Sequence, residues 1–312
     1  MGTLVIGADG GGTKTALVAL DLSENRIVSQ SEAPGCNAYD CGRDTAAERV
    51  LEGIEALHLS PEDRVLAIGL GDPAMDDSLP DASLLKEALQ EKLSFPVFAV
   101  SDVFAALYAY TKGEAGALLI AGTGSMGLAL QEKALPPHKP KLFTVGGWGL
   151  PTADGGSAYA IAVQAIGAAF DAFDGIAPPT LLCQALQERY EVSAPRGLIE
   201  VFNGTPRSRS EIASFAKEVD RCAKEGDATA RELLHRAGNT LGRYGIALLE
   251  GLPREQRRLG LFGSVMQKNQ SVRDTLISTV KERFPEAEVG VSPTSPAVGA
   301  ALYAVHAIGA TK

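Results

Sequence analysis

The chain has few of the residues on which several common kinds of protein depend. Its 312 residues include only four cysteines, four histidines and one tryptophan. Cys36 and Cys41 lie close in sequence, but no cysteine or histidine nearby completes a zinc site, so we expect free thiols. The histidines fall in no motif, which argues against catalysis by a Ser-His or Cys-His pair.

Long apolar runs and basic patches are also absent from the sequence. No uninterrupted apolar run reaches the roughly 18 residues that a membrane-spanning helix needs, and no basic, leader-like segment is present at the start. Lysine and arginine number 29 against 38 aspartates and glutamates, which gives a net charge of −9. We therefore expect no membrane and no nucleic acid as partners. A low number of cysteines is typical of proteins in the reducing cytosol, so we expect a cytoplasmic protein.

Glycine, by contrast, is plentiful, and its first cluster lies in Leu4–Leu20, LVIGADGGGTKTALVAL. The pattern predicts an apolar strand, a tight turn and a second strand, in which glycines let backbone N–H groups approach a ligand closely. Hydroxyls and a lysine in the turn suit phosphate oxygens, and a carboxylate at the strand's end suits a hydrated magnesium ion. The predicted phosphate ligands are Gly11, Gly12, Thr13, Lys14 and Thr15, and the predicted metal ligand is Asp9.

Two better-known phosphate-binding motifs do not fit this segment. A Walker A loop requires glycine where Thr13 stands, and a dinucleotide-binding fingerprint requires glycine where Thr15 stands. Both motifs also continue into a helix, whereas an apolar strand is predicted here. The segment therefore predicts a phosphate-binding hairpin.

A second segment, Ala117–Leu130, repeats the strand–turn–strand pattern as ALLIAGTGSMGLAL, with Gly122, Thr123, Gly124 and Ser125 in the turn. The repeat indicates an internal duplication, and two such hairpins would hold one phosphate chain from both sides. Strand meanders followed by helix–strand units predict an α/β fold with two related domains, each a mixed sheet with flanking helices, around a central cleft. We expect domains at 1–113 and 114–295, with a final helix, 296–309, packed back on the first.

Three polar residues at the ends of predicted elements have two interpretations each. Asp102 lies between a strand, Val97–Val100, and a helix, so it is either a helix N-cap or a carboxylate that accepts a proton. Asp154 precedes a long predicted helix and is likewise a cap or a ligand contact. Asn37 follows a predicted strand break and is a turn residue or a ligand contact.

Several motifs together resemble the N-acetylglucosamine kinase family, which is the BadF/BadG-type branch of the actin-like sugar-kinase superfamily. The similarity covers nearly the whole chain, including the helical segment Ile212–Gly238. It implies two actin-like (RNase H-like) domains and ATP-dependent phosphorylation of the 6-hydroxyl of an aminohexose, N-acetylglucosamine or glucosamine. The motifs, in the family's order and spacing, are DGGGTKT (Asp9–Thr15), SDVFAAL (Ser101–Leu107), AGTGS (Ala121–Ser125), GGWG with DGGSAY (Gly146–Tyr159) and LFGS (Leu261–Ser264).

The resemblance also implies roles for individual residues and two cofactors, ATP and Mg²⁺. Asp102 matches the family's catalytic base and contacts the sugar. The other implied sugar contacts are Asn37, Gly147, Trp148 and Asp154, and the implied nucleoside contacts are Gly263 and Ser264. We also expect a homodimer.

Two loops that border the sugar in the family differ here. Asp72-Pro73 replaces a pair of small residues, and Gly155 replaces an acidic residue. A broad-specificity hexokinase and an N-acetylmuramate kinase therefore remain alternatives. A non-catalytic ATP- or sugar-binding regulator and a dehydratase-activating ATPase are further ones, although Cys36 and Cys41 do not match the iron–sulfur site of such activators.

Overall fold

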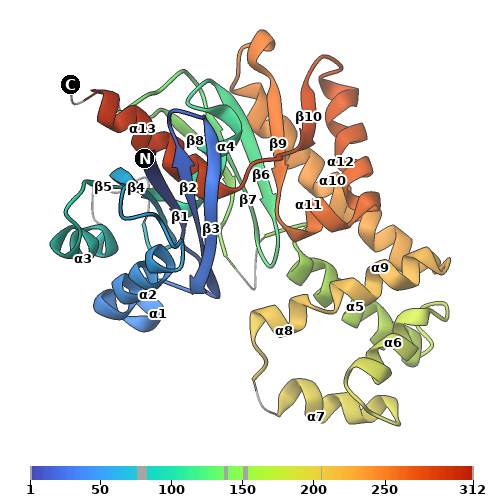
Figure 1. Cartoon of the computed structure of the whole chain (residues 1–312). Helices are drawn as coiled ribbons and strands as arrows, with labels where there is room; N and C mark the ends of the chain where they lie inside the picture. Colours follow the sequence, from blue (N-terminus) through green and yellow to red (C-terminus); the bar gives the residue numbers. More distant parts are fainter. Residues whose placement is uncertain (1, 76–82, 137–139, 150–153, 205, 311–312) are drawn as a thin grey trace. The chain divides into compact units, whose positions relative to one another are not determined.

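The computed structural model describes residues 2–75, 83–136, 140–149, 154–204 and 206–310 (Figure 1). The chain forms two compact units. Unit 1 comprises residues 1–116, 128–142 and 292–312, and unit 2 comprises residues 117–127 and 143–291. Residues 128–142 thus group with unit 1. The sequence analysis placed them in the second domain, and its division at residues 113 and 114 stays a prediction.

The first sheet contains five strands in the order β3-β2-β1-β4-β5. The first three strands pair antiparallel as a meander, and β1, β4 and β5 run parallel to one another. Parallel strands end at the same edge of a sheet, so the residues after β1, β4 and β5 come together there. The strands are β1 (Thr3–Asp9), β2 (Lys14–Asp21), β3 (Arg26–Pro34), β4 (Arg64–Asp72) and β5 (Val97–Ser101), all of them predicted, with small shifts at their ends.

Helices cover both faces of this sheet. One face packs its apolar side chains against α2 and α3, and the other packs against α13. A Cβ added to Gly7 would lie 1.9 Å from the backbone oxygen of Ala297, and one added to Gly69 would lie 1.8 Å from that of Ala300. The backbone of α13 therefore rests directly on β1 and β4. The helices of unit 1 are α1 (Ala38–Cys41), α2 (Arg43–Glu55), α3 (Leu84–Lys92), α4 (Asp102–Thr111) and α13 (Pro296–Ala310).

The second sheet has the order β10-β9-β6-β7-β8. Counted from its β8 edge, it has the same arrangement as the first: three consecutive strands, then two that follow parallel to the innermost one. The shared order confirms the predicted fold of two related sheets with flanking helices. The strands are β6 (Gly116–Ala121), β7 (Ser125–Leu130), β8 (Leu142–Gly146), β9 (Arg258–Phe262) and β10 (Glu288–Val291); β8 was not predicted.

Helices make up most of unit 2. The long α10 packs along α12 and against β9, while α6, α8 and α9 lie beside α5. The segment Ser210–Leu249, predicted as two or more helices, contains three. The helices of unit 2 are α5 (Ala158–Phe173), α6 (Leu181–Arg189), α7 (Leu198–Asn203), α8 (Arg209–Ala213), α9 (Ala216–Lys224), α10 (Ala228–Glu250), α11 (Ser264–Lys268) and α12 (Gln270–Arg283).

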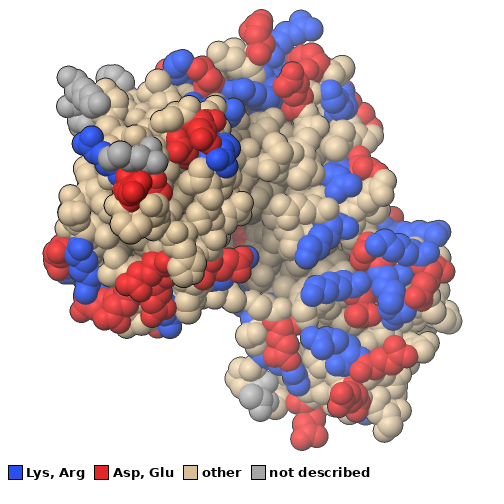
Figure 2. Space-filling view, in the orientation of Figure 1, with Lys and Arg blue, Asp and Glu red and all other residues tan. Residues whose placement is uncertain are grey.

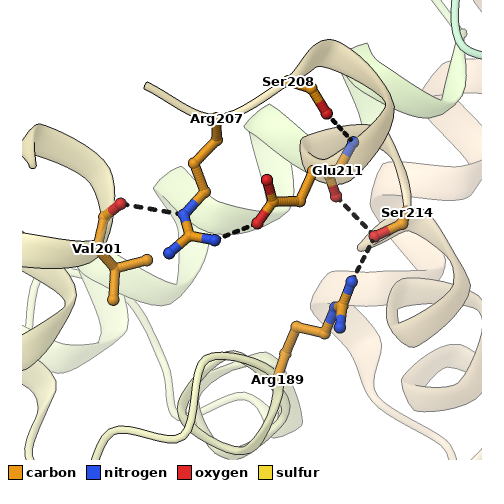
Figure 3. Close-up of polar contacts among 6 residues, drawn as sticks. All are labelled: Arg189, Val201, Arg207, Ser208, Glu211 and Ser214. Carbon is orange, nitrogen blue, oxygen red and sulfur yellow. Dashed lines mark hydrogen bonds and ion pairs between the residues drawn. The ribbon is translucent and has the colours of Figure 1, made fainter. Parts of the chain in front are cut away.

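A polar network joins α6, α7 and α8 (Figure 3). Arg189 donates to the Ser214 hydroxyl at 2.9 Å, and that hydroxyl donates to the backbone oxygen of Glu211 at 2.6 Å. Arg207 pairs with the Glu211 carboxylate and donates to the backbone oxygen of Val201 at 3.1 Å. These contacts fix the short helix α8 and the residues that lead from it into α9.

Three further features concern the described residues. None of the helices there is long and apolar enough to cross a membrane. All four cysteines are free thiols, as predicted for Cys36 and Cys41, and Cys36 is buried. The described part of the chain contains no group of three or more His, Cys, Asp or Glu side chains placed to hold a metal ion.

Candidate active site

Three carboxylates gather at the edge where the parallel strands of the first sheet end. Asp9 is the last residue of β1, Asp72 is the last residue of β4, and Asp102 follows β5 directly. The sheet register places Asp9 beside Gly71, and Asp72 beside Ser101. The chain therefore brings the predicted base and the predicted metal ligand to one edge of one sheet.

The helix that begins at Asp102 is capped by its neighbour. The hydroxyl of Ser101 accepts a hydrogen bond from the backbone N–H of Phe104 at 3.0 Å, which makes Ser101 the N-cap of α4. Asp102 is the first residue of the helix, and its Oδ1 accepts from the N–H of Val103 at 2.8 Å. The N-cap interpretation of Asp102 is therefore wrong. Its carboxylate lies in the first turn, where the helix dipole favours a negative charge.

The carboxylate of Asp9 has an unusual acidity. Burial, followed by the negative charge of Asp102, raises the pKa of Asp9 from 3.8 to about 7, and the positive charge of Lys14 acts in the opposite direction. An ionised carboxylate in such a place is costly unless a cation lies nearby. The environment of Asp9 thus fits a residue that faces a bound cation.

Asp72 has a structural task in the loop that follows β4. It is 1% exposed, its Oδ1 accepts from the N–H of Ala74 at 2.9 Å, and its Oδ2 accepts from the hydroxyl of Ser83 at 2.6 Å. Ser83 in turn caps α3 by accepting from the N–H of Lys86. Asp72, one of the departures from the family pattern, thus joins the two ends of the β4–α3 loop; residues 76–82 lie outside the described residues.

The first glycine turn presents its backbone to solvent. Gly12, Thr13 and Lys14 are exposed, and the carbonyls of Gly11 and Thr13 accept hydrogen bonds from the N–H groups of Cys36 (3.0 Å) and Gly35 (3.2 Å). Within the described part of the chain, no hydrogen bond occupies the N–H of Gly12 or of Thr13. These donors are therefore available to an anion.

Two residues of the predicted phosphate set are engaged within the protein. The Lys14 ammonium forms an ion pair with Glu32 on the neighbouring strand at 2.5 Å. Thr15 is fully buried, and its hydroxyl donates to the backbone oxygen of Pro34 at 2.9 Å. Thr15 thus holds the hairpin together, and we remove its hydroxyl from the candidate phosphate ligands because it points into the protein.

The second glycine turn is built in a similar way. Thr123 is exposed, whereas Ser125 is buried and its hydroxyl donates to the backbone oxygen of Gly155 at 3.0 Å. The carbonyl of Gly122 accepts from the N–H of Ala158 at 2.8 Å, so the turn is attached to the first residue of α5. Ser125, like Thr15, acts within the protein, which leaves Gly122, Thr123 and Gly124 as the parts of this turn that a phosphate can reach.

Asp154 contains a buried acceptor with no partner. It is 6% exposed and has a backbone φ of +66°, a conformation that residues other than glycine rarely adopt. Its Oδ1 accepts no hydrogen bond from any described residue, and a Cβ on Gly124 would lie 2.7 Å from its Oδ2. Ser157, and not Asp154, caps α5. Since buried polar atoms are nearly always hydrogen-bonded, Oδ1 is an acceptor suited to a ligand hydroxyl.

The three remaining predicted sugar contacts occupy different surroundings. Trp148 is 86% exposed, and the N–H of the adjacent Gly147 donates to the backbone oxygen of Ser125 at 3.1 Å. The tryptophan side chain is therefore exposed, while the backbone next to it is hydrogen-bonded to the second glycine turn. In unit 1, Asn37 caps α1 by accepting from the N–H of Tyr39 at 2.9 Å. The turn interpretation of Asn37 is thus seen directly, and its contact with a sugar stays a prediction.

A pocket of about 590 Å³ lies within unit 2 and begins at the second glycine turn. Thr123 and the predicted nucleoside residue Ser264 both line it, and the preceding Gly263, with a φ of +95°, would place a Cβ 2.5 Å from the backbone oxygen of Ala121. Lysine and arginine side chains gather over α9 and its neighbours, with acidic side chains among them (Figure 2). The sequence analysis missed the charged and amide residues that line the pocket. Three of them have the spacing of one helix face, on α9: Lys217, Asp220 and Lys224. The other two are Lys268 and Asn269.

The chain is similar to curated kinases along its whole length. It is 27% identical to the N-acetyl-D-glucosamine kinase of Dictyostelium discoideum, with 97% of this chain and 98% of that protein covered. It is also 27% identical to the glucosamine kinase GspK of Vibrio cholerae, with 95% and 94% covered. Among solved structures, a protein of Chromobacterium violaceum provisionally named N-acetylglucosamine kinase has the same fold, with a TM-score of 0.74, 24% identity and coverage of 96% and 98%.

These similarities agree with the two sheets of equal strand order and with the glycine turn at the same place in each. Residues 6–304 match the BadF/BadG/BcrA/BcrD ATPase family. The match spans both units and every site residue described above. The chain belongs to the BadF/BadG/BcrA/BcrD ATPase family.

Proposed function

We propose that this protein is an ATP-dependent kinase that phosphorylates the 6-hydroxyl of an aminohexose, N-acetylglucosamine or glucosamine. The observation that carries the proposal is the pocket of about 590 Å³ that opens beside Thr123 of a glycine turn in a member of an ATPase family. Phosphoryl transfer requires that the phosphates be held and their charge stabilised, with few chemical groups beyond a base. The names of the two curated relatives support an amino sugar as acceptor.

Each candidate residue has a role in such a transfer. The Asp102 carboxylate accepts the proton of the 6-hydroxyl while that oxygen bonds to the γ-phosphorus and the bond to the β-phosphate oxygen breaks, which leaves ADP and the sugar 6-phosphate. The free N–H groups of Gly12 and Thr13 bind phosphate oxygens. The unpartnered Oδ1 of Asp154 accepts a hydrogen bond from a sugar hydroxyl.

A magnesium ion is the cation that fits Asp9. Mg²⁺ usually keeps several waters and is held by one or two carboxylates together with substrate phosphates, so a site with few protein ligands suits it. The raised pKa of Asp9 shows that its ionised form is disfavoured in the protein alone. A bound cation would offset this, because a nearby positive charge favours the ionised form. When bound, the ion would neutralise charge on the phosphate oxygens. Asp9, at the end of β1, would bind the hydrated ion.

The test is a measurement of ADP release with N-acetylglucosamine, glucosamine, N-acetylmuramic acid and glucose, each with ATP and Mg²⁺. We expect the highest kcat/KM on one of the first two sugars, with the product identified as the 6-phosphate by ³¹P NMR. Equal rates on glucose would identify a broad-specificity hexokinase, and a preference for N-acetylmuramic acid would identify the third alternative. ADP release that no sugar accelerates would overturn the sugar-kinase proposal in favour of a simple ATPase. Sugar or ATP binding without turnover would indicate a regulator.

Two properties of the whole molecule belong to the same proposal. We expect a homodimer, because apolar side chains of α5 and of the segments that follow it, Val163, Phe170, Ile176 and Ile199, are exposed and such groups often mark protein contacts. Light scattering after gel filtration measures this directly. The four free thiols support a reducing compartment, the cytoplasm.

A further inference from the structure

Asp220 lies in the wall of the unit 2 pocket and is held from two sides. Its Oδ1 accepts a hydrogen bond from the side-chain amide of Asn269 at 3.0 Å, and its Oδ2 accepts from the Lys224 ammonium at 2.6 Å. Asn269 is itself fixed, because its Oδ1 caps α12 by accepting from the N–H of Val272 at 2.9 Å. The Asp220 side chain retains 23% of its exposure. It is therefore an oriented carboxylate with lone pairs left for a ligand.

The pocket has a phosphate end and an opposite end. Thr123 and Ser264 mark the phosphate end, since a Cβ on Gly122 of the glycine turn would lie 3.9 Å from the Ser264 hydroxyl. Asn269 follows α11 directly, five residues after Ser264, and five helical residues at 1.5 Å each span roughly 7.5 Å. Its partner Asp220 lines the same pocket beside it. A nucleotide whose phosphates meet the turn places its ribose in between and its base near Asp220.

We propose that Asp220 selects the nucleotide base, accepting a hydrogen bond from the 6-amino group of adenine and rejecting purines that carry a 6-oxo group. The inference rests on the proposed use of ATP as phosphoryl donor. A carboxylate only accepts hydrogen bonds, so it is complementary to an amine and repels a carbonyl oxygen. A site built around such a polar group discriminates strongly against an analogue that leaves it unpaired.

Lys224 and Asn269 act as positioning residues in this scheme. Lys224 balances the charge of Asp220, which limits repulsion between the carboxylate and the nucleotide's phosphates. Asn269 fixes the direction of the carboxylate by linking α9 to the start of α12. Neither contact distinguishes one base from another. Discrimination at the 6-position comes from Asp220.

The experiment compares ATP with inosine triphosphate, in which a carbonyl replaces the 6-amine and the adjacent N1 carries a hydrogen. Wild type and Asp220→Asn are assayed for kcat/KM with both nucleotides and for binding of ADP and IDP by calorimetry. Wild type should prefer the adenine nucleotides. In Asp220→Asn the amide can donate to a 6-oxo group, so we expect the adenine-to-inosine ratio to fall by tenfold or more. Asp274→Asn, on the exposed side of α12, is the charge-matched control and should keep the wild-type ratio.

An unchanged ATP-to-ITP ratio in Asp220→Asn would overturn the inference. So would a change confined to the ratio of ATP to 2′-deoxy-ATP, because Asp220 would then contact the ribose. If Asp220→Asn melts at a much lower temperature than wild type, Asn269→Ser is assayed instead. Serine keeps a capping oxygen for α12 but lacks the amide that donates to Asp220. We expect a smaller fall in the ATP-to-ITP ratio for this variant, and no fall would contradict the inference. Calorimetry separates this from the proposed function: adenine-selective ADP binding without sugar phosphorylation would remove the kinase proposal and leave the role of Asp220 intact.

Discussion

The charge of Asp102 raises the pKa of Asp9, in addition to the larger effect of burial. The two residues are far apart in sequence and meet because β1 and β5 run parallel, with β4 between them. Two carboxylates at one edge make it costly for both to be ionised together unless a cation is present. This coupling gives the first prediction.

Without magnesium, the contribution of Asp9 to the stability of the protein should fall as the pH rises from about 4 to about 7. Between the unfolded pKa of 3.8 and the folded pKa of about 7, Asp9 keeps its proton in the folded state and loses it in the unfolded state. Unfolding then releases a proton, so the free energy of unfolding decreases with pH across this window and levels off above it. Urea unfolding of wild type and Asp9→Asn at several pH values measures the difference.

The asparagine variant lacks the titrating group, so its advantage over wild type should grow from pH 4 to pH 7. Curves that stay parallel across this window would contradict the assigned environment of Asp9. Adding Mg²⁺ and ATP should flatten the wild-type curve, because a cation favours the ionised carboxylate. The same variant should show weaker dependence of turnover on magnesium concentration.

The second prediction separates the chemistry of Asp102 from the stability of α4. Asp102→Asn removes the proton acceptor and leaves the cap at Ser101 intact, so kcat should fall by roughly 10²–10⁴-fold with little change in melting temperature. Ser101→Ala removes the hydroxyl that accepts from Phe104 and should cost about 1 kcal/mol of stability. Steady-state kinetics and thermal unfolding of both variants provide the measurement.

If Asp102→Asn keeps more than about a third of wild-type kcat, a loss far smaller than a general base would give, Asp102 is not the base. A variant that loses stability and keeps its activity would instead give Asp102 a purely structural role. ATP affinity should remain near the wild-type value in either case, which shows that the nucleotide site is intact.

The third prediction uses two glycines of one turn. A Cβ on Gly124 would lie 2.7 Å from Oδ2 of buried Asp154, so Gly124→Ala must displace the turn or the carboxylate, and we expect a loss of about 1–3 kcal/mol. A Cβ on Gly122 finds no atom nearer than the Ser264 hydroxyl at 3.9 Å, so Gly122→Ala should change stability by about 0.5 kcal/mol or less. Urea unfolding of the pair measures the contrast, and equal losses would refute the close contact with Asp154.

The fourth prediction concerns the only tryptophan. Because Trp148 is 86% exposed, Trp148→Ala should leave the melting temperature nearly unchanged. If the side chain contacts the amine or N-acetyl side of the sugar, the ratio of kcat/KM for the preferred aminosugar to that for glucose should change. A loss of the same factor on both sugars would remove Trp148 from the residues that set sugar preference.

The sequence analysis was most successful where short-range patterns decide the structure. Both glycine turns lie between predicted apolar strands, since the alternation of apolar segments and consecutive glycines leaves few other conformations. Residue roles within the turns were harder to predict. Thr15 and Ser125 have the hydroxyl chemistry of phosphate ligands, yet both side chains point inward, because a strand alternates its faces with each residue.

Other parts of the site depend on contacts between distant segments. Asp220 lies on α9 and Asn269 caps α12, and only folding places the amide of Asn269 against the carboxylate of Asp220. Ser101 and Asp102 both have side chains suited to capping, and the backbone at the end of β5 decides which of them caps. The bond between Asp72 and Ser83 likewise spans a loop whose closure no local pattern predicts.

The close packing of α13 on β1 and β4 has a consequence for biosynthesis. Gly7 and Gly69, near the start of the chain, have no room for a side chain because the backbone of the last helix occupies that space. One face of the first sheet therefore stays uncovered while the ribosome makes the intervening residues, and its apolar side chains are buried only after Pro296–Ala310 has been released. Unit 1 therefore completes its core only after the strands of both sheets have been made. Loss of the fifteen-residue helix α13 would most affect the first sheet, whose strands come much earlier in the chain.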